Sequence, residues 1–491
     1  MNRRIIVVGG GISGLAAAHR LMELDRDKTL GLEVLLLEAG SYLGGSITTE
    51  HVGDFLVENG PDAFVTEKPW ALQLCERLGI TSRLISTNPA HQKLYVVHKG
   101  SLQALPEGFF LLAPTRLRPL IRTPLFSWHG KLRMALDLIL PRGGVEGDES
   151  LASFVRRRFG REALERVAQP LIGGVYAADP EKLSLAATMP RFPEMERAKR
   201  SVIWAMWSGR RRRSRTPDSG SGARWSLFVT FMGGMQELID AIACRLPGGA
   251  VHLGADVTGL EWDAVRKSWM ITTGEPERLE AKGVILATPS YRSADILSPF
   301  APDLAGQLRT ISYSSTATVS LAYRRDDIPH SLDGFGIVAP AIESRKIIAC
   351  SFSSIKYTRR APEGHVLLRA FVGGALQPAL FEQDDSTLET SVRQELASLL
   401  GIKASPLFCR IHRHPRSMPQ YNVGHLRLVW RLEEDLKQFS GLELAGSAYH
   451  GVGIPDCVRS GEAAAEKIWS HLKRRANGTP VDSDAARKVS G

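Results

Sequence analysis

The chain has 491 residues, 43% of them hydrophobic, and a formal net charge of +10 at pH 7. This is more chain than one ordinary core holds, so we expect two or three lobes of a folded protein. No run of about 18 apolar residues occurs, which argues against a transmembrane helix, and the five cysteines lack the C-x-x-C spacing of zinc or iron–sulfur sites, so we expect no bound metal.

The first predicted element is a buried parallel strand at Arg4–Val8, a short β-branched run. Because it begins so close to the start of the sequence, we expect no signal segment and a cytoplasmic protein. A helix is predicted at Ile12–Leu24 from its apolar spacing. The loop between them carries Gly9, Gly11 and Gly14 in the G-x-G-x-x-G pattern. Such a loop either binds a dinucleotide pyrophosphate at the helix N-terminus or only turns a strand tightly into a helix.

A second strand at Glu33–Leu37 leads into Glu38. A carboxylate about 20 residues beyond the glycine loop is placed to accept hydrogen bonds from a ribose diol. The combination of strand, glycine loop, helix, strand and Glu38 therefore predicts a dinucleotide site.

Three further blocks bear on which dinucleotide binds. They are "EAGSYLGGSITT" (38–49), "FLVENGPDAF" (55–64) and a closing strand, glycine turn and amphipathic helix at 442–469. Together with "LGADVTGLEW" (253–262) and "ILATPS" (285–290), these blocks resemble the flavin-dependent amine oxidase superfamily. The resemblance implies FAD as the cofactor, and an ordinary loop is the alternative interpretation of the second glycine pair.

Three more segments narrow the resemblance. "GGVYAADPEKLSLAATMP" (173–190), "TFMGGMQELIDAI" (230–242) and "GVGIPDCVRSG" (451–461) resemble the porphyrinogen oxidases of haem biosynthesis. Residues 105–141 resemble bacterial members that act on coproporphyrinogen III, and some that act on protoporphyrinogen IX. The resemblance implies six-electron oxidation of a porphyrinogen to the porphyrin, with electrons passed through FAD to O2 and released as H2O2.

The resemblance also implies which residues contact FAD. The expected cofactor-binding residues are Gly9, Gly10, Gly11, Ile12, Ser13, Gly14, Glu38, Ala39, Gly45, Ser46, Gly60, Pro61, Asp62, Ala63, Val257, Val452, Gly453 and Ile454. Ser46 departs from the larger residue that relatives often carry after the glycine pair, so its local contacts are open.

Expected substrate contacts come from "CSFSSIKYTRRAPEGHVLLRAFVGG" (350–374). In the family an aromatic side chain of this segment packs on a pyrrole ring, and Tyr357 matches it, with Lys356 beside it as a propionate partner. A surface loop is the alternative. Near "KLYVV" (93–97) many plant and animal members carry an arginine where this chain has Leu94, and Lys93 is a candidate replacement.

The charge supports the same substrate class. Porphyrinogens carry two or four propionates, which cationic donors around an apolar floor bind well. An amine oxidase instead needs acidic and aromatic groups to collect cations, and the middle of the chain has no evident acidic cluster.

No catalytic side chain is predicted, because the flavin performs the difficult step and the protein orients it. We hypothesise hydride transfer from a methylene bridge to flavin N5, repeated three times. His450, Asp456 and Tyr449 lie near the closing glycine turn, and we expect each to be structural.

Basic residues gather in the middle third, at Arg156–Arg158, Arg197–Arg200 and Arg210–Arg215. A solvated surface explains each run. No nucleic-acid-binding motif accompanies them, so we expect no nucleic-acid partner. Residues 109–141 mix apolar and basic side chains in a pattern that suits either a peripheral membrane surface on the inner face of the cell membrane or a helical core.

The predicted fold class is α/β (α+β), with a Rossmann-like FAD-binding domain, a mixed-sheet substrate domain and a helical lobe. The FAD-binding domain is expected in three segments, at 1–90, 230–290 and 436–473, with the helical lobe at 105–207 and the substrate domain at 291–435. A flexible basic linker is expected at 208–222 and a disordered tail at 474–491, both from polar composition. A homodimer is compatible with the sequence.

Three alternatives stay open. A flavin amine oxidase or a carotenoid desaturase would share the flavin blocks and differ in the pocket. A non-catalytic binding protein on the same scaffold would lack bound flavin.

Overall fold

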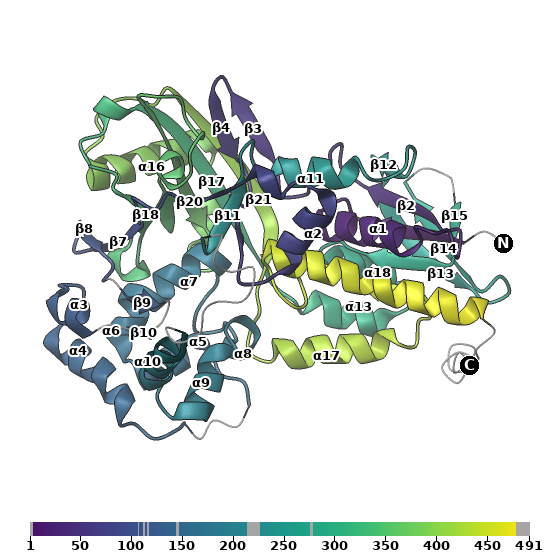
Figure 1. Ribbon diagram of the computed structural model, residues 1–491, viewed down its shortest axis with the longest axis horizontal. Helices are drawn as coiled ribbons and strands as arrows, with labels where there is room; N and C mark the ends of the chain where they lie inside the picture. Colours follow the sequence, from purple (N-terminus) through teal and green to yellow (C-terminus); the bar gives the residue numbers. More distant parts are fainter. Residues whose placement is uncertain are drawn as a thin grey trace.

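The computed structural model describes residues 3–106, 108–110, 113–114, 117–143, 147–213, 226–274 and 278–477. A five-stranded parallel sheet forms the centre of one half of the molecule (Figure 1). Its strand order is β12-β2-β1-β16-β22, with β1 at Arg4–Val8, β2 at Glu33–Glu38, β12 at Val251–Leu253, β16 at Gly283–Leu286 and β22 at Leu442–Leu444. The strands predicted at 4–8 and 33–37 are confirmed.

Both faces of this sheet are covered. Alternate β1 residues enter different cores: Ile5 and Val7 pack into one, and Ile6 and Val8 into the other. The first core is closed by α1 (Ile12–Leu24), α2 (Trp70–Leu78), α11 (Gln236–Ala243) and α18 (Ile454–Ala476). The second is closed by β13 (Val257–Asp263), β14 (Ser268–Thr273), β15 (Arg278–Ala281), α12 (Ser290–Leu297), α13 (Pro302–Arg309) and α17 (His425–Leu436). Burial on both faces explains why β1 is a continuous apolar run.

A second, seven-stranded sheet lies at the upper left in Figure 1. Its order is β21-β17-β20-β19-β18-β7-β8, with β7 at Lys93–His98, β8 at Ser101–Ala104, β17 at Tyr313–Arg324, β18 at Gly334–Val338, β19 at Ala349–Ser351, β20 at His365–Gly373 and β21 at Phe408–Pro419. β18 pairs with β7 in parallel and the other pairs are antiparallel, so the predicted mixed sheet is confirmed. α16 (Asp385–Leu400) packs its apolar side on it.

Two strands of this sheet come from outside the predicted range of 291–435. β7 and β8 precede the helical lobe in the chain, and β7 gives β18 a partner on the side that would otherwise be an open edge. The lobe is therefore an insertion between strands of one sheet.

The helical lobe follows β8, and its core also includes Val96, Val338 and Ala349 of the seven-stranded sheet. Its elements are β9 (Phe109–Phe110), β10 (Ala113–Pro114), α3 (Leu117–Arg122), α4 (Trp128–Ala135), η2 (Leu136–Leu138), α5 (Leu151–Arg158), α6 (Arg161–Ala163), η3 (Leu164–Ala168), α7 (Gln169–Tyr176), α8 (Leu185–Thr188), α9 (Arg191–Lys199) and α10 (Val202–Arg213). Within the described residues, no helix has the length and apolar character needed to cross a membrane.

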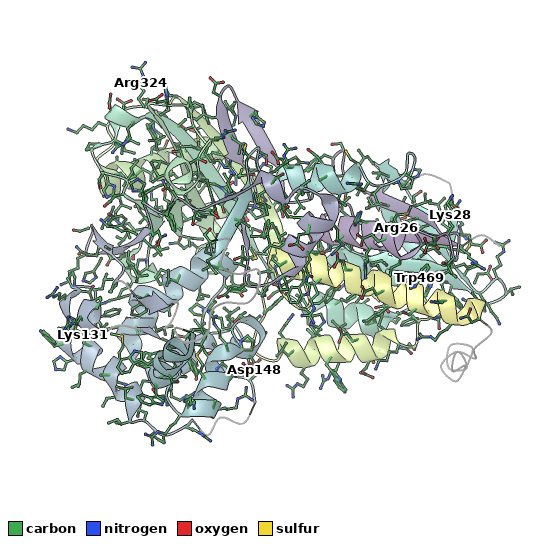
Figure 2. All side chains as sticks on the ribbon, in the orientation of Figure 1. Arg26, Lys28, Lys131, Asp148, Arg324 and Trp469 are labelled. Carbon is green, nitrogen blue, oxygen red and sulfur yellow. The ribbon has the colours of Figure 1, made fainter. Side chains whose placement is uncertain are left out.

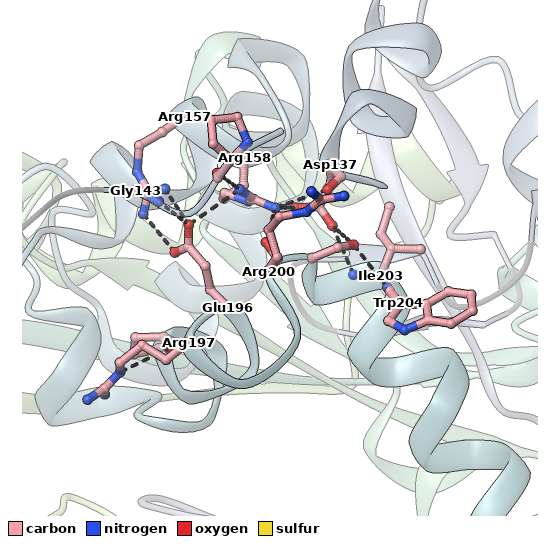
Figure 3. A network of polar contacts seen from close by, with 12 residues as sticks. Asp137, Gly143, Arg157, Arg158, Glu196, Arg197, Arg200, Ile203 and Trp204 are labelled. Carbon is pink, nitrogen blue, oxygen red and sulfur yellow. Dashed lines mark hydrogen bonds and ion pairs between the residues drawn. The ribbon is translucent and has the colours of Figure 1, made fainter. Parts of the chain in front are cut away.

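One basic run of the lobe is not simply a solvated surface. In α5, Arg156 is half exposed and pairs with Glu181, whereas Arg158 is 1% exposed and pairs with Asp137, which is fully buried (Figure 3). Successive residues on a helix point about 100° apart, so one run meets both solvent and core. The buried pair joins α5 to η2.

Two boundaries differ from the sequence expectation. α10 continues to Arg213, so residues 208–213 of the predicted linker are helical, which suits arginine because it is a good helix former. α18 continues to Ala476, so residues 474–476 of the predicted tail are helical as well. The remainder of both predicted segments, apart from Asn477, lies outside the described residues.

The other elements are short. They are β3 (Thr49–Val52), β4 (Phe55–Glu58), β5 (Phe64–Val65), η1 (Thr81–Arg83), β6 (Leu84–Ser86), β11 (Phe228–Phe231), η4 (Arg325–Asp327), η5 (Ala341–Glu343), α14 (Ser353–Lys356) and α15 (Pro378–Phe381). β3 pairs with β4, and β11 lies between β5 and β6.

Candidate functional site

The glycine loop between β1 and α1 has the shape of a phosphate-binding turn. Gly9 has φ +109°, a value that favours glycine, and it makes the tight turn. A Cβ on Gly14 would lie 1.9 Å from the Gly9 carbonyl oxygen, so only glycine allows this close packing. A Cβ on Gly11 would meet no atom within 4 Å. The loop is therefore closely packed at Gly14 and open at Gly11, where a pyrophosphate would approach.

Glu38 lies at the end of β2, beside this loop. Its Oε2 accepts a hydrogen bond from the Gly10 amide at 2.6 Å, and its Oε1 accepts one from the Gly40 amide at 2.7 Å. Each carboxylate oxygen has a further lone pair, so the side chain can still accept from two ribose hydroxyls. Ala39 follows it and is exposed.

The second glycine block packs directly on the first. The Gly44 amide donates to the Gly10 carbonyl at 2.9 Å, and Gly11 and Gly44 form a parallel bridge. A Cβ on Gly45 would lie 3.5 Å from Gly11 Cα, and one on Gly60 would lie 1.6 Å from the Ser46 carbonyl oxygen. The structure thus brings three separate predicted cofactor segments together.

The N-terminus of α18 reaches the same region. A Cβ on Gly461 would lie 2.0 Å from the Ser13 carbonyl oxygen, so α18 crosses α1 in close contact. Neither Gly11, the N-cap of α1, nor Gly453, the N-cap of α18, has a side chain to cap its helix. Both helices therefore present first-turn N–H groups to an anionic or electron-rich ligand. Val452 and Ile454 flank the second of these N-caps.

Val257 lies near the Glu38 end of the site. Leu253 pairs with Glu38 across β12 and β2, and the Ala255 amide donates to the Glu38 carbonyl at 2.9 Å. β13 begins two residues later, at Val257, which is buried. β13 therefore begins close to the Glu38 end of β2.

These features fit a bound dinucleotide cofactor. An open cradle at Gly11, a carboxylate with free acceptor capacity and two uncapped helix N-termini converge from β1, β2, α1 and α18. Within the described part of the chain, no group of three or more His, Cys, Asp or Glu residues could hold a metal ion.

The predicted substrate residues lie beside Asp62. Lys356 Nζ is 3.0 Å from an Asp62 carboxylate oxygen and 5.0 Å from the centroid of the Tyr357 ring. Although burial opposes it, Lys356 holds the pKa of Asp62 below its ordinary value. Tyr357 is buried, and its hydroxyl has no hydrogen-bond partner among the described residues. Lys356 is therefore already paired with a carboxylate of this chain, and a substrate propionate would have to share its charge.

Sequence reasoning missed two buried arginines here. Arg369 in β20 donates to the Asn59 carbonyl at 3.2 Å and to the Gly60 carbonyl. Arg360 donates to the Phe231 carbonyl at 2.9 Å. The available signal was a charged residue within the apolar strand sequence "HVLLRAFVG", because a buried charge requires partners.

Two titratable groups flank the Asn59–Asp62 turn. Burial raises the pKa of Glu58 to about 7, and the nearby Arg360 only partly opposes this. Burial lowers the pKa of His414 to about 4, and its Nε2 lies 2.8 Å from the Asn59 carbonyl. With this low pKa, His414 is neutral near pH 7. Because a carbonyl oxygen only accepts hydrogen bonds, the single ring proton is on Nε2.

Other candidate residues have partners within the protein. Lys93 pairs with Asp333, which also accepts a hydrogen bond from the Tyr95 hydroxyl. His450 Nε2 lies 2.8 Å from a Glu433 oxygen. Of the two others expected to be structural, Asp456 pairs with Lys68 at 2.6 Å and Tyr449 is buried.

Known proteins resemble this chain over nearly its whole length. Residues 12–469 match the family described as flavin containing amine oxidoreductase. The chain is 34% identical to a coproporphyrinogen III oxidase of Bacillus subtilis (strain 168), over 96% of this chain and 98% of that protein. It is 31% identical to the chloroplastic protoporphyrinogen oxidase of Oryza sativa subsp. japonica, over 96% and 89% of the two chains.

Solved structures agree with these matches. A protein of Exiguobacterium sp. 255-15 superposes with a TM-score of 0.83 at 30% identity, over 96% of this chain and 99% of that one. Cyclohexylamine oxidase from Brevibacterium oxydans IH-35A gives a TM-score of 0.68 at 17% identity, over 96% and 100% of the chains, and shares the fold.

Proposed function

Because this chain belongs to the flavin containing amine oxidoreductase family, we propose that it is an FAD-dependent porphyrinogen oxidase of haem biosynthesis. Full-length similarity to coproporphyrinogen III oxidases carries the proposal, at 34% identity for one relative and 31% for another from Staphylococcus aureus. The open position at Gly11 and the Glu38 carboxylate are evidence for FAD as the cofactor. The substrate is coproporphyrinogen III or protoporphyrinogen IX, since relatives with both names match over nearly the whole chain.

The reaction removes six electrons and six protons from the porphyrinogen. Bound FAD supplies two-electron oxidation chemistry, so three rounds complete the porphyrin. Three molecules of O2 accept the electrons and protons and leave as three H2O2. This acceptor is part of the proposal.

The chain's own residues hold and orient the reactants. Glu38 would hold the ribose of FAD, and the uncapped N-termini of α1 and α18 would hold its pyrophosphate and stabilise its electron-rich ring. Tyr357 is 1% exposed, so a pyrrole ring could pack on it only after its ring is uncovered. Lys356 shares its charge between Asp62 and a substrate propionate, which fixes the orientation of the macrocycle.

Anaerobic mixing tests the proposal. The FAD-loaded protein is mixed with coproporphyrinogen III, protoporphyrinogen IX, putrescine or phytoene, and flavin absorbance is followed. We expect bleaching by a porphyrinogen, then porphyrin and H2O2 after O2 is admitted. Bleaching by putrescine or phytoene alone would favour the two other enzyme classes. Purified protein that cannot retain FAD would indicate a binding protein.

We also propose that the helical lobe binds a membrane surface peripherally. Trp128 and Leu132 are one turn apart on α4 and are 70% and 65% exposed. Lys131 lies between them, 4.6 Å from the Trp128 ring, and donates to the carbonyl of Ile121, which is 51% exposed (Figure 2). Exposed apolar groups beside cations suit an anionic lipid interface.

Vesicle sedimentation tests this surface. We expect the wild type to bind vesicles containing phosphatidylglycerol and the Trp128→Ser/Leu132→Ser variant to lose most binding. Trp430→Ser is the matched control, because Trp430 is 60% exposed on α17, which is not part of the lobe. Equal binding by all three proteins would contradict a lobe-specific surface. The homodimer and the cytoplasmic location remain predictions, and light scattering and cell fractionation test them.

A further inference from the structure

The segment 420–425, which follows β21 and ends with the first residue of α17, contacts both the helical lobe and the glycine turn before α18. Tyr421 is its central residue and is 1% exposed. The Tyr421 hydroxyl donates to the Ser447 carbonyl and accepts from the Gly451 amide at 2.8 Å. One hydroxyl therefore joins the two ends of the 447–451 turn.

The turn that Tyr421 holds is sterically constrained. Gly451 has φ +151°, and a Cβ there would lie 2.4 Å from the Asp456 carboxyl carbon. Gly453, two residues on, is the N-cap of α18 and has no side chain to cap that helix. A shift of the Gly451 amide would therefore move the part of the chain that meets the flavin.

The Tyr421 ring is itself held in place. It stacks on His425 with the ring centroids 3.9 Å apart and the planes at 11°. His425 Nε2 lies 2.9 Å from the Tyr449 carbonyl, and burial lowers the pKa of His425. A neutral His425 therefore donates from Nε2 to the same turn.

The other side of the segment binds the lobe. The Ser184 amide donates to the Tyr421 carbonyl at 2.7 Å, and the Val423 amide donates to the Lys182 carbonyl at 2.8 Å. Asp148 accepts from the Gly424 amide and from the Ser184 hydroxyl, both at 2.8 Å. Figure 2 labels Asp148 where the lobe meets the start of α17.

We propose that Tyr421 is a positioning residue for the flavin turn, and that segment 420–425 links the docking of the helical lobe to the environment of the flavin. A movement of residues 148 and 182–184 is transmitted to Gly451 through the backbone of segment 420–425 and the Tyr421 hydroxyl. The inference depends on FAD at this turn and is independent of which substrate is oxidised.

The test uses full-length protein loaded with FAD and no substrate. Tyr421→Phe keeps the stacked ring and removes both hydrogen bonds. The control is Tyr323→Phe, a buried tyrosine in the seven-stranded sheet. The readouts are the dissociation constant of FAD, the visible absorption spectrum and the midpoint potential of the flavin.

We expect Tyr421→Phe to weaken FAD binding about 3- to 10-fold, because the two lost hydrogen bonds hold the turn and only part of their free energy, about that of one bond, reaches the affinity for FAD. The spectrum and the potential should both shift. Tyr323→Phe should leave all three unchanged. Equal values for the two variants would overturn the positioning role. Because these readouts need no porphyrinogen, a failure of the proposed substrate leaves the result interpretable.

Asp148→Asn tests the link to the lobe, and also serves if Tyr421→Phe does not fold. It weakens the anchor of Gly424 on the lobe side of the segment. We expect a smaller shift of the flavin spectrum and potential in the same direction as in Tyr421→Phe. A wild-type spectrum and potential in Asp148→Asn would overturn the link.

Discussion

Replacement of Arg158 by methionine should destabilise the helical lobe strongly. The Arg158 guanidinium is 1% exposed, and it donates to Asp137 Oδ1 at 2.6 Å and to the Arg200 and Pro141 carbonyls at 2.7 and 2.9 Å. Its loss leaves the buried Asp137 carboxylate without a cation, although two hydrogen bonds to that group remain. Breaking a buried ion pair in this way costs about 3–5 kcal/mol.

Arg156 provides the matched control within the same run. Its partner Glu181 is exposed, and both side chains are about half accessible, so Arg156→Met should cost less than about 1 kcal/mol. Urea unfolding followed by tryptophan fluorescence measures both variants. The Arg158→Met/Asp137→Leu double variant should cost less than the sum of its single changes, because no buried charge is left unpaired. Equal costs for Arg156→Met and Arg158→Met, or additive costs in the double variant, would refute the reasoning.

Other predictions concern pH, cofactor and packing. Burial raises the pKa of Glu58 from 4.5 to about 7, so the folded chain keeps a proton that the unfolded chain loses, and the free energy of unfolding falls between pH 4.5 and 7. Melting temperatures of Glu58→Gln should lack this decline. Burial lowers the pKa of His414 from 6.5 to about 4, so its contribution is present above pH 6.5 and is lost as the pH falls toward 4. His414→Gln should remove that loss, and an unchanged pH profile would count against the burial argument. Glu38→Gln should weaken FAD binding about 10-fold, because hydrogen bonds to a charged acceptor are lost. A fluorescence titration measures this affinity, and a wild-type value would exclude the ribose role. Gly461→Ala should lower the melting temperature by several degrees because its Cβ would lie 2.0 Å from a carbonyl oxygen of α1. Gly306→Ala, with open space around its Cβ in α13, should not lower it.

Local patterns predicted the cofactor half of the site well. The strand, glycine loop, helix and Glu38 are nearly contiguous, and each residue's part follows from its own neighbours in the chain. β1, α1 and β2 therefore begin where the pattern indicated. Assignment to FAD instead came from distant blocks that only a family resemblance could connect.

Long-range partners were beyond the sequence pattern. Lys356 was interpreted as a propionate ligand, and its contact with Asp62 spans 294 positions of the chain. Arg156 and Arg158 are equivalent in the sequence pattern. They differ in burial because α5 points Arg158 toward Asp137. The pairing of β7 with β18 likewise depends on a register that no local pattern encodes.

The five-stranded sheet is gathered from residues 4–8, 33–38, 251–253, 283–286 and 442–444. During synthesis its edge strand β22 and the glycine turn after it are made after every other strand of the sheet. Closing such distant loops is slow, and it leaves β16 without one neighbour until late. FAD added to arrested nascent chains should thus bind only to lengths that include α18, which makes cofactor capture the closing event of folding.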